Sequence, residues 1–403
     1  MTTSTDGWRR SRLSPDDAFL VVADLHNHTL LSDGRGDPDR AFAQMRTAGL
    51  DVAALTDHAS IPREQRDELG LHQYPDDDAL DVARHMPRSF DEAAWERTAE
   101  LADEFDVPGV FTALRGFEWT EPWLGHVNVW FSDGYQHVDT PGSLAGLFDF
   151  LAEREQKALF GYNHPGREGG RHEEFAAPAA PDGNGPDADL SGRMVALEAF
   201  NRGDDYLFGL GGADSAIVAC LDAGWRPGLI GCSDEHGTQY GLAGRGRTGL
   251  WVHEHSRSGV RDALARRRSF ATRETGLRFD ATLDGVPTGA PGHVGERAEL
   301  AVDLAFADAD RGGLPVELQV LTSAAATGGE SPEVSVVARV PARVGDVTRA
   351  VVDVPASAPW VLLRVADPTR PYGPTGGPAG RAPRGHPCDC WALAYSSPWW
   401  RAA

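Results

Sequence analysis

Histidine and acidic side chains recur in this sequence at the ends of short apolar runs. The candidates are His26, His28, Asp33, His58, Glu118, His126, His164, Asp234 and His236. Residues i and i+2 of an extended segment point to the same side, so His26 and His28 can reach one metal ion together. A single histidine at such a place is most often a hydrogen-bonded core residue. Nine residues gathered in this pattern favour a metal centre instead.

The number and type of these side chains indicate more than one ion. Nine nitrogen and oxygen donors exceed the roughly four to six that one Zn²⁺, Mn²⁺ or Fe²⁺ takes. We therefore expect two or three divalent ions, with Glu118 as the best candidate for a bridging ligand. Clustered ions generate a metal-activated hydroxide and polarise an ester, carbamate or phosphoryl oxygen. The predicted reaction is metal-assisted hydrolysis.

Four residues are candidates for further catalytic roles. Asp234 can ligate a metal and accept a proton from water, and His164 can ligate or protonate a leaving group. Asp57, beside His58, either orients a ligand imidazole or caps a turn. Arg167 either grips a phosphate or carboxylate of the substrate, or is a solvated loop arginine.

Two further patterns lie close to these candidates or imitate them. Trp119 and Trp123 flank the Glu118 to His126 turn and are expected to wall an apolar substrate pocket, whereas Trp130 is read as core. The second His-x-His, at 253–255, has no carboxylates or His-Pro pair of its own. It is interpreted as a surface feature at a strand end.

The first two-thirds of the chain alternates strand and helix patterns, which predicts an α/β fold with mostly parallel strands. Roughly 250 residues of this pattern is the size of a β/α barrel. Two interruptions, 60–90 and 166–192, are expected to be insertions over the active face or surface loops. The expected strands are 19–25, 52–56, 110–117, 127–131, 158–163, 194–201, 228–233 and 249–252, and the expected helices are 38–49, 91–105, 143–156, 213–223 and 257–268.

The sequence pattern changes after about Leu277, where short alternating β-rich runs separated by turns replace the helical patterns. These runs predict a C-terminal antiparallel β-sandwich. The expected division is a metallohydrolase domain over 18–276 and a β-sandwich domain over 277–403. A length of 403 residues agrees with two domains.

The chain is strongly acidic, with 60 Asp plus Glu against 38 Lys plus Arg and a net charge of −22. This balance disfavours long nucleic acids and anionic membrane surfaces as partners. No signal peptide or membrane span is expected, so a cytoplasmic protein is predicted. Four scattered cysteines, including Cys388 and Cys390, are expected to be reduced structural thiols. The expected partner is a small-molecule substrate, and a homo-oligomer is possible.

In combination, His26-x-His28, Ser32-Asp33-Gly34, Thr56-Asp57-His58, Glu118, His126, His164-Pro165 and Ser233-Asp234-x-His236 resemble the PHP (polymerase and histidinol phosphatase) superfamily. The resemblance covers about residues 21–273. It implies a distorted (β/α)7 barrel with two or three divalent ions, held by the nine residues named above. The sequence around Glu118 and Gly125-His126-Val127-Asn128-Val129 is similar to the carbaryl-hydrolase-like branch of large metallohydrolases.

The predicted function is hydrolysis of a small phosphoester, carboxyl ester or carbamate. Two alternatives remain open: a mononucleotide or oligonucleotide phosphoesterase, and a non-catalytic PHP scaffold. Scaffold domains of the family often lose ligands, whereas all nine positions are filled here. A serine hydrolase is disfavoured because the sequence has no Gly-x-Ser-x-Gly elbow.

Overall fold

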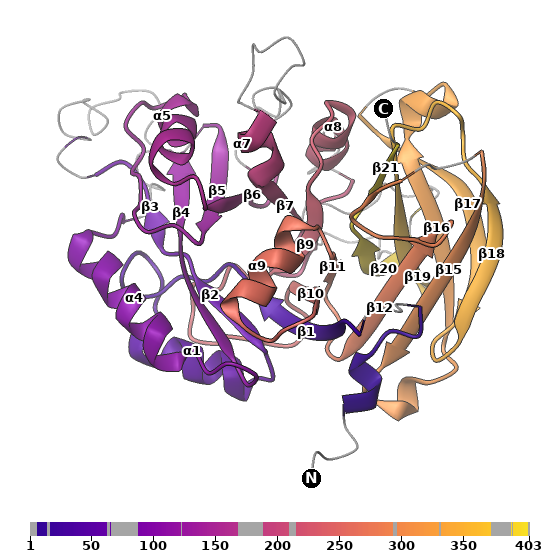
Figure 1. Cartoon of the computed structure of the whole chain (residues 1–403), viewed down its shortest axis with the longest axis horizontal. Coiled ribbons are helices and arrows are strands. Elements are labelled where there is room, and N and C mark those ends of the chain that lie inside the picture. The colour runs from indigo at the N-terminus through magenta and orange to yellow at the C-terminus, as the bar shows by residue number, and fades with distance from the viewer. Residues whose placement is uncertain are drawn as a thin grey trace.

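The computed structural model is a mixed α/β protein with one large sheet and one small sheet (Figure 1). The structure describes residues 6–13, 17–62, 65, 88–121, 123–167, 188–208, 215–292, 296–329, 332–371, 388 and 390–401. Most of the two expected insertions, 60–90 and 166–192, lies outside these ranges. None of the described helices is long and apolar enough to cross a membrane.

The N-terminal strands that carry the candidate ligands hydrogen-bond in the order β1-β2-β4-β5-β6-β7-β9. An isolated parallel bridge between Asn27 and Glu235 then joins the residues after β9 to those after β1. Their bounds are β1 Phe19–Asp24, β2 Val52–Leu55, β3 His58–Ala59, β4 Thr112–Glu121, β5 Gly125–Trp130, β6 Leu159–Tyr162, β7 Met194–Asn201, β8 Asp204–Asp205 and β9 Gly228–Cys232.

The expectation of mostly parallel strands needs correction at β5 and at β10 (Arg247–Val252), which is antiparallel to β1. Strand β5 is antiparallel to both of its neighbours, β4 and β6. The reason is the very short connection between β4 and β5, which allows a hairpin but no crossover. Because β5 runs backwards, its first residues lie beside the last residues of β4, and Thr120 pairs with His126. A histidine at the start of a strand thereby joins ligands that follow the ends of other strands.

Helices cover the N-terminal strands, and acidic side chains cap the N-termini of two of them. The side chain of Asp37 caps α1, which has a proline at its first position, and Asp91 caps α4. The region expected as one helix over 143–156 contains a short α-helix followed by a π-helical turn over Phe150–Arg154. The α-helices are α1 Pro38–Thr47, α4 Glu92–Phe105, α5 Ala145–Asp149, α7 Ala188–Arg193, α8 Ala216–Asp222 and α9 Arg257–Ala265.

The C-terminal strands form two layers that share one core (Figure 1). The small sheet has the order β13-β12-β15-β18, and the large sheet contributes β20-β19-β16-β17. Leu277, Phe279 and Leu300 of the first layer pack with Leu318, Leu363 and other residues of the second. The bounds are β12 Leu277–Leu283, β13 Val286–Pro287, β14 Pro291–Gly292, β15 Arg297–Phe306, β16 Pro315–Ser323, β17 Val334–Arg343, β18 Val347–Asp353, β19 Trp360–Pro371, β20 Cys390–Ser396 and β21 Trp399–Arg401.

The large sheet is continuous from the N-terminal to the C-terminal strands. It passes through β10 (Arg247–Val252) and β11 (Ser269–Thr272), all antiparallel: β10 pairs with β1, β11 with β10, and β20 with β11. The strands at β11 and β20 were not expected from the sequence. A buried polar chain runs alongside this junction, where the Tyr395 hydroxyl donates to Asp205 at 2.8 Å and accepts from Arg364 at 3.2 Å.

This polar chain leads to a stability prediction. Tyr395→Phe removes both hydrogen bonds from a side chain that is fully buried. We expect the free energy of unfolding to fall by about 1–3 kcal/mol, the cost of leaving buried polar groups less well satisfied. Urea denaturation measures this value. Tyr135→Phe is the control, because Tyr135 is partly exposed and water can replace the hydroxyl that this change removes. Equal losses of stability in the two variants would contradict the prediction.

Candidate metal centre

All nine predicted ligands converge on one end of the strands. His26 and His28 follow β1, His164 follows β6, and Asp234 and His236 follow β9. Glu118 and His126 come from the hairpin of β4 and β5, His58 opens β3, and Asp33 comes from the loop after β1. The convergence results from the parallel strands, whose carboxyl ends share one rim, and from the reversed direction of β5.

The nine side chains form four overlapping groups, and within each group the donor atoms lie within 4.8 Å of one another. Four residues, His26, His28, His58 and Glu118, belong to two groups each, so the groups are contiguous. The groups are His28, Asp33, His58 and His236; His26, His28 and Glu118; His26, His164 and Asp234; and His58, Glu118 and His126.

Glu118 is the carboxylate common to the middle of this cluster. Its Oε1 lies 3.1 Å from His26 Nε2, 3.2 Å from His126 Nδ1 and 3.4 Å from His164 Nε2. Its Oε2 lies 2.7 Å from His58 Nδ1 and 3.5 Å from His28 Nε2. Both oxygens thus face imidazole nitrogens, which is the arrangement a bridging ligand requires.

Divalent ions fit these residues. Ligand atoms around one ion at bonds of roughly 2.0–2.2 Å lie about 3–3.5 Å apart, and most of the contacts around Glu118 have this spacing. His26 Nε2 and His28 Nε2 face each other at 2.9 Å. Glu118 Oε2 is buried and accepts no hydrogen bond from the described residues, although His58 lies close. Such an atom is costly to bury unless a cation satisfies it.

Burial and the neighbouring charges set the protonation of these groups. Burial raises the pKa of Glu118, but the imidazoles of His26, His126 and His58 outweigh it and hold that pKa well below its usual range. Burial, aided by His58 and His236, lowers the pKa of His28. Burial raises the pKa of Asp33, yet its hydrogen bond with His58 and the nearby imidazoles bring it to about 2. Burial lowers the pKa of His26 and His58, but Glu118 and the other carboxylates outweigh it, raising the first well above its usual value and the second to about 10. A metal ion ligated by these two imidazoles would therefore displace their protons.

A layer of hydrogen bonds behind the ligands fixes their orientation. His26 Nδ1 lies 2.9 Å from Glu198 Oε1, which directs His26 Nε2 into the cluster. Glu198 Oε2 accepts from the backbone N–H of His164 at 2.7 Å, and Asn163 Nδ2 donates to Glu118 Oε1 at 2.6 Å. No role for Asn163 was predicted from the sequence. The signal for Asn163 is its place in the Asn-His-Pro segment at a strand end.

Asp57 holds the loop that carries Asp33. Its carboxylate accepts four hydrogen bonds from one turn: the backbone N–H and hydroxyl of Thr29 at 2.8 and 2.9 Å, and those of Ser32 at 3.1 and 2.6 Å. Of the two roles considered for Asp57, turn capping is the one that these four hydrogen bonds support. Through this turn Asp57 positions Asp33 next to His58.

Two arginines face the metal cluster through Asp234. Arg167 Nη1 lies 2.9 Å and Arg202 Nη2 3.2 Å from Asp234 Oδ2. The other oxygen, Oδ1, faces His26, His28 and His236. Arg167 also donates to Asn201 and to the hydroxyl of Tyr206. The role of Tyr206 could not be found from the sequence, because no motif marks the short strand β8 that precedes it.

Several site residues have strained backbones. His164, Arg202 and Asp234 have φ angles of 26°, 55° and 49°, in the left-handed region that residues other than glycine rarely adopt. Each of them directly follows or lies just beyond a strand. Strain of this kind persists where the surroundings hold a residue in a functional position.

The tryptophans beside Glu118 do not lie as expected. Trp119 and Trp130 are both fully buried, in two different parts of the core, so Trp119 does not wall a pocket, whereas Trp123 is partly exposed. The error arose because β4 continues to Glu121 and turns Trp119 inwards.

His255 hydrogen-bonds the backbone of Asp51, away from the cluster, as expected for a surface feature. Cys388 and Cys390 are free thiols.

Comparison with known proteins gives limited likenesses. A family model described as a protein of unknown function, DUF3604, matches residues 71–160. No curated protein is significantly similar in sequence. Three solved structures are similar in part: a two-domain protein from Bacteroides vulgatus containing a predicted PHP-like metal-dependent phosphoesterase (17% identity, 87% of this chain and 91% of that chain, TM-score 0.44); endonuclease Q with a 27-mer duplex substrate bearing an abasic lesion (13%, 61% and 56%, 0.34); and histidinol phosphate phosphatase from Lactococcus lactis with zinc, L-histidinol and phosphate (13%, 53% and 86%, 0.27). At these identities, the function is argued from the residues of this chain.

The arrangement around Glu118 predicts how metal content responds to mutation. Glu118→Gln keeps the size of the side chain but removes the negative charge shared by two of the four donor groups. We expect purified wild-type protein to hold two or three divalent ions per chain and the variant to hold at least one fewer, as measured by elemental analysis. His253→Ala, at an exposed histidine outside the cluster, is the control. Unchanged metal content in Glu118→Gln would contradict the bridging role.

Proposed function

We propose that this protein is a metal-dependent hydrolase of the PHP type that cleaves a small phosphoester. One observation carries the proposal: nine nitrogen and oxygen donors converge on the rim, with Arg167 and Arg202 beside them. The sequence motifs that resemble the PHP superfamily support it. The finer resemblance to the carbaryl-hydrolase-like branch bears only on the choice of substrate.

The fold belongs to the same proposal. The ring of pairings from β1 to β9, returned to β1 by the Asn27–Glu235 bridge, would be the distorted (β/α)7 barrel of a domain over 18–276. The two layers built from β12 to β21 would be the β-sandwich over 277–403. In this division β11 and β20 join the two domains edge to edge.

The nine ligand residues would hold two or three divalent ions, of which zinc, manganese and iron suit imidazole and carboxylate donors. When bound, such ions lower the pKa of water and polarise a phosphoryl oxygen. The chain's own contribution is to bind and orient. Glu198 and Asn163 fix ligand orientation, and Asp57 fixes the loop of Asp33.

Arg167 and Arg202 favour an anionic substrate. Their guanidinium groups lie at the edge of the cluster, and both are partly exposed. A guanidinium offers paired N–H donors that match the oxygens of a phosphate. Hydrolysis would consume one water, form a new P–O bond and break the P–O bond to the leaving alcohol. The leaving oxygen would take its proton from His164 or His236 at the rim if that histidine did not ligate a metal ion at this step.

Other functions receive less support from the same residues. A carboxyl ester or carbamate would offer the two arginines no anionic group of the substrate in addition to the Asp234 carboxylate that they already contact. A long nucleic acid is disfavoured by the net charge of −22. A non-catalytic scaffold has no need of nine ligand positions.

The proposal predicts a metal-dependent substrate preference. On a single preparation, we expect turnover of p-nitrophenyl phosphate or bis-p-nitrophenyl phosphate and little turnover of 1-naphthyl acetate. Dialysis against a chelator should abolish the activity, and Zn²⁺ or Mn²⁺ should restore it, because the ligands remain in place. Activity only on the carboxyl ester would retire the phosphoesterase assignment, and full activity without metal would retire the metallohydrolase.

A second prediction isolates the arginines. Arg202→Met should raise KM for p-nitrophenyl phosphate by about tenfold, since one charge-assisted hydrogen bond is worth roughly 1.5 kcal/mol or more. Any turnover of a neutral ester should have an unchanged KM. Arg349→Met, at an exposed arginine on β18, is the matched control. An equal effect on charged and neutral substrates would mean that Arg202 does not contact the phosphate.

A further inference from the structure

A second cavity lies at the opposite end of the strands from the metal cluster. It has a volume of about 840 Å³, which is within the range of roughly 300–1,000 Å³ for small-molecule sites. Its walls come from the turn before β9, the end of α9 with the turn that leads into β11, and the C-terminal residues Pro287 and Trp400. Arg226 lines it before β9 begins, whereas Asp234 follows the end of β9. Eight extended residues at about 3.3 Å each separate the two sites by roughly 25 Å at most along the strand.

The charge of this cavity is opposite to that of the protein. Four arginines line it, with Asp262 as the single carboxylate among the lining residues. The arginines are Arg226, Arg266, Arg267 and Arg268. The chain as a whole has a net charge of −22, so a concentration of positive charge here is unusual for this protein. Confined charges of one sign create a field that attracts the opposite ion.

Not all of these charges are neutralised. Arg266 pairs with Asp262 at 2.9 Å, and Arg268 lies 3.5 Å from Asp280. Arg267 donates to backbone carbonyls, including that of Arg226, and burial together with the charge of Arg226 lowers its pKa to about 10. The exposed guanidinium of Arg226 has no carboxylate partner among the described residues. The cavity therefore retains positive charge.

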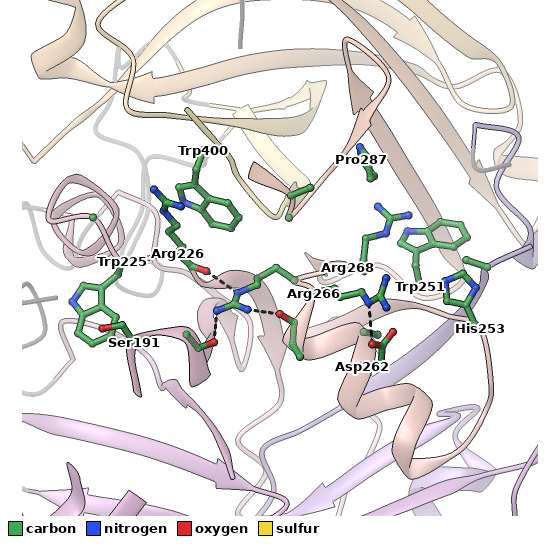
Figure 2. A pocket seen from close by; sticks show the side chains of 18 of the residues that line it. Ser191, Trp225, Arg226, Trp251, His253, Asp262, Arg266, Arg268, Pro287 and Trp400 are labelled. Atoms are coloured by element: carbon green, nitrogen blue, oxygen red, sulfur yellow. Dashed lines mark hydrogen bonds and ion pairs between the residues drawn. The ribbon is translucent and has the colours of Figure 1, made fainter. Parts of the chain in front are cut away.

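Aromatic side chains supply the other half of the wall. Figure 2 shows Trp400 with Arg226 on one side of the cavity and Trp251 with Arg268 on the other. The lining also includes Trp225, and the indole N–H groups of Trp225 and Trp400 have no hydrogen-bond partner among the described residues. Both nitrogens are buried against protein, so these side chains contribute apolar indole surface to the wall of the cavity. Indole and guanidinium together suit a flat apolar group next to an anion.

We propose that this cavity binds a small organic anion, with a flat aromatic or apolar body and a phosphate, sulfonate or carboxylate group. The body would lie between the tryptophans, and the anionic group would contact Arg226 and Arg266. Because the walls come from the turns before β9 and β11 and from β21, such a ligand would bridge the N-terminal and C-terminal parts of the chain. The proposal does not depend on hydrolysis at the metal centre.

The test uses the full-length, metal-loaded protein and naphthalene-2-sulfonate, an aromatic anion that cannot be hydrolysed as an ester. Calorimetric titration should show one site per chain, and neutral 2-naphthalenemethanol should bind at least tenfold more weakly. Binding should also raise the melting temperature in proportion to the logarithm of the probe concentration, because the ligand binds only the folded state.

Variants assign the binding to this cavity. Arg226→Gln and, separately, Arg266→Gln should weaken probe binding at least tenfold, and both arginines are exposed enough to be replaced without loss of the fold. Arg349→Gln is the matched surface control and should bind normally. Glu118→Gln should also bind normally, which separates this cavity from the metal centre. Equal binding of the neutral probe, loss of binding in Glu118→Gln, or wild-type affinity in both arginine variants would overturn the proposal.

Discussion

The structure depends on the cost of burying Glu118. This carboxylate is fully buried and has nitrogens of five histidines within 3.5 Å. A buried charge is tolerated only where opposite charge and hydrogen bonds surround it on every side. Four separate chain segments supply those partners, since His26 and His28 share one, and each must arrive with its side chain correctly directed. The reversal at β5 brings His126 to this carboxylate, and the strained residue after β6 is His164, another of its partners.

Many residues of the metal-binding cluster could be predicted from the sequence, because short spacings and strand ends determine where they lie. Spacing of two residues places His26 with His28 and Asp234 with His236, and parallel strands bring their ends together without further information. The N-cap at Asp37, followed by a proline at the first helical position, was likewise predictable from a short motif. The nine residues could therefore be named before their contacts were known.

The parts that escaped prediction depend on contacts between distant segments. Arg167 faces Asp234 across 67 residues of sequence, and no local pattern tells such a loop arginine from a solvated one. The inward direction of Trp119 depends on how far β4 continues. The β11–β20 pairing was missed because short apolar runs far apart in a chain do not reveal their partners. The positive charge of the second cavity could not be predicted from the net charge of −22 either, because its arginines lie in separate turns that only the fold brings together.

The β11–β20 junction has a consequence for how the chain is made. The hydroxyl of Thr272 in β11 donates to the carbonyl of Leu393, 121 residues later. At a synthesis rate of about 5–20 residues per second, the edge of β11 waits roughly 6 to 24 seconds on the ribosome for its neighbour. Until then its backbone N–H and carbonyl groups are open to pairing with another nascent chain. The aggregation risk of this fold is thus kinetic: it arises during translation, at the strand that joins the two halves of the chain.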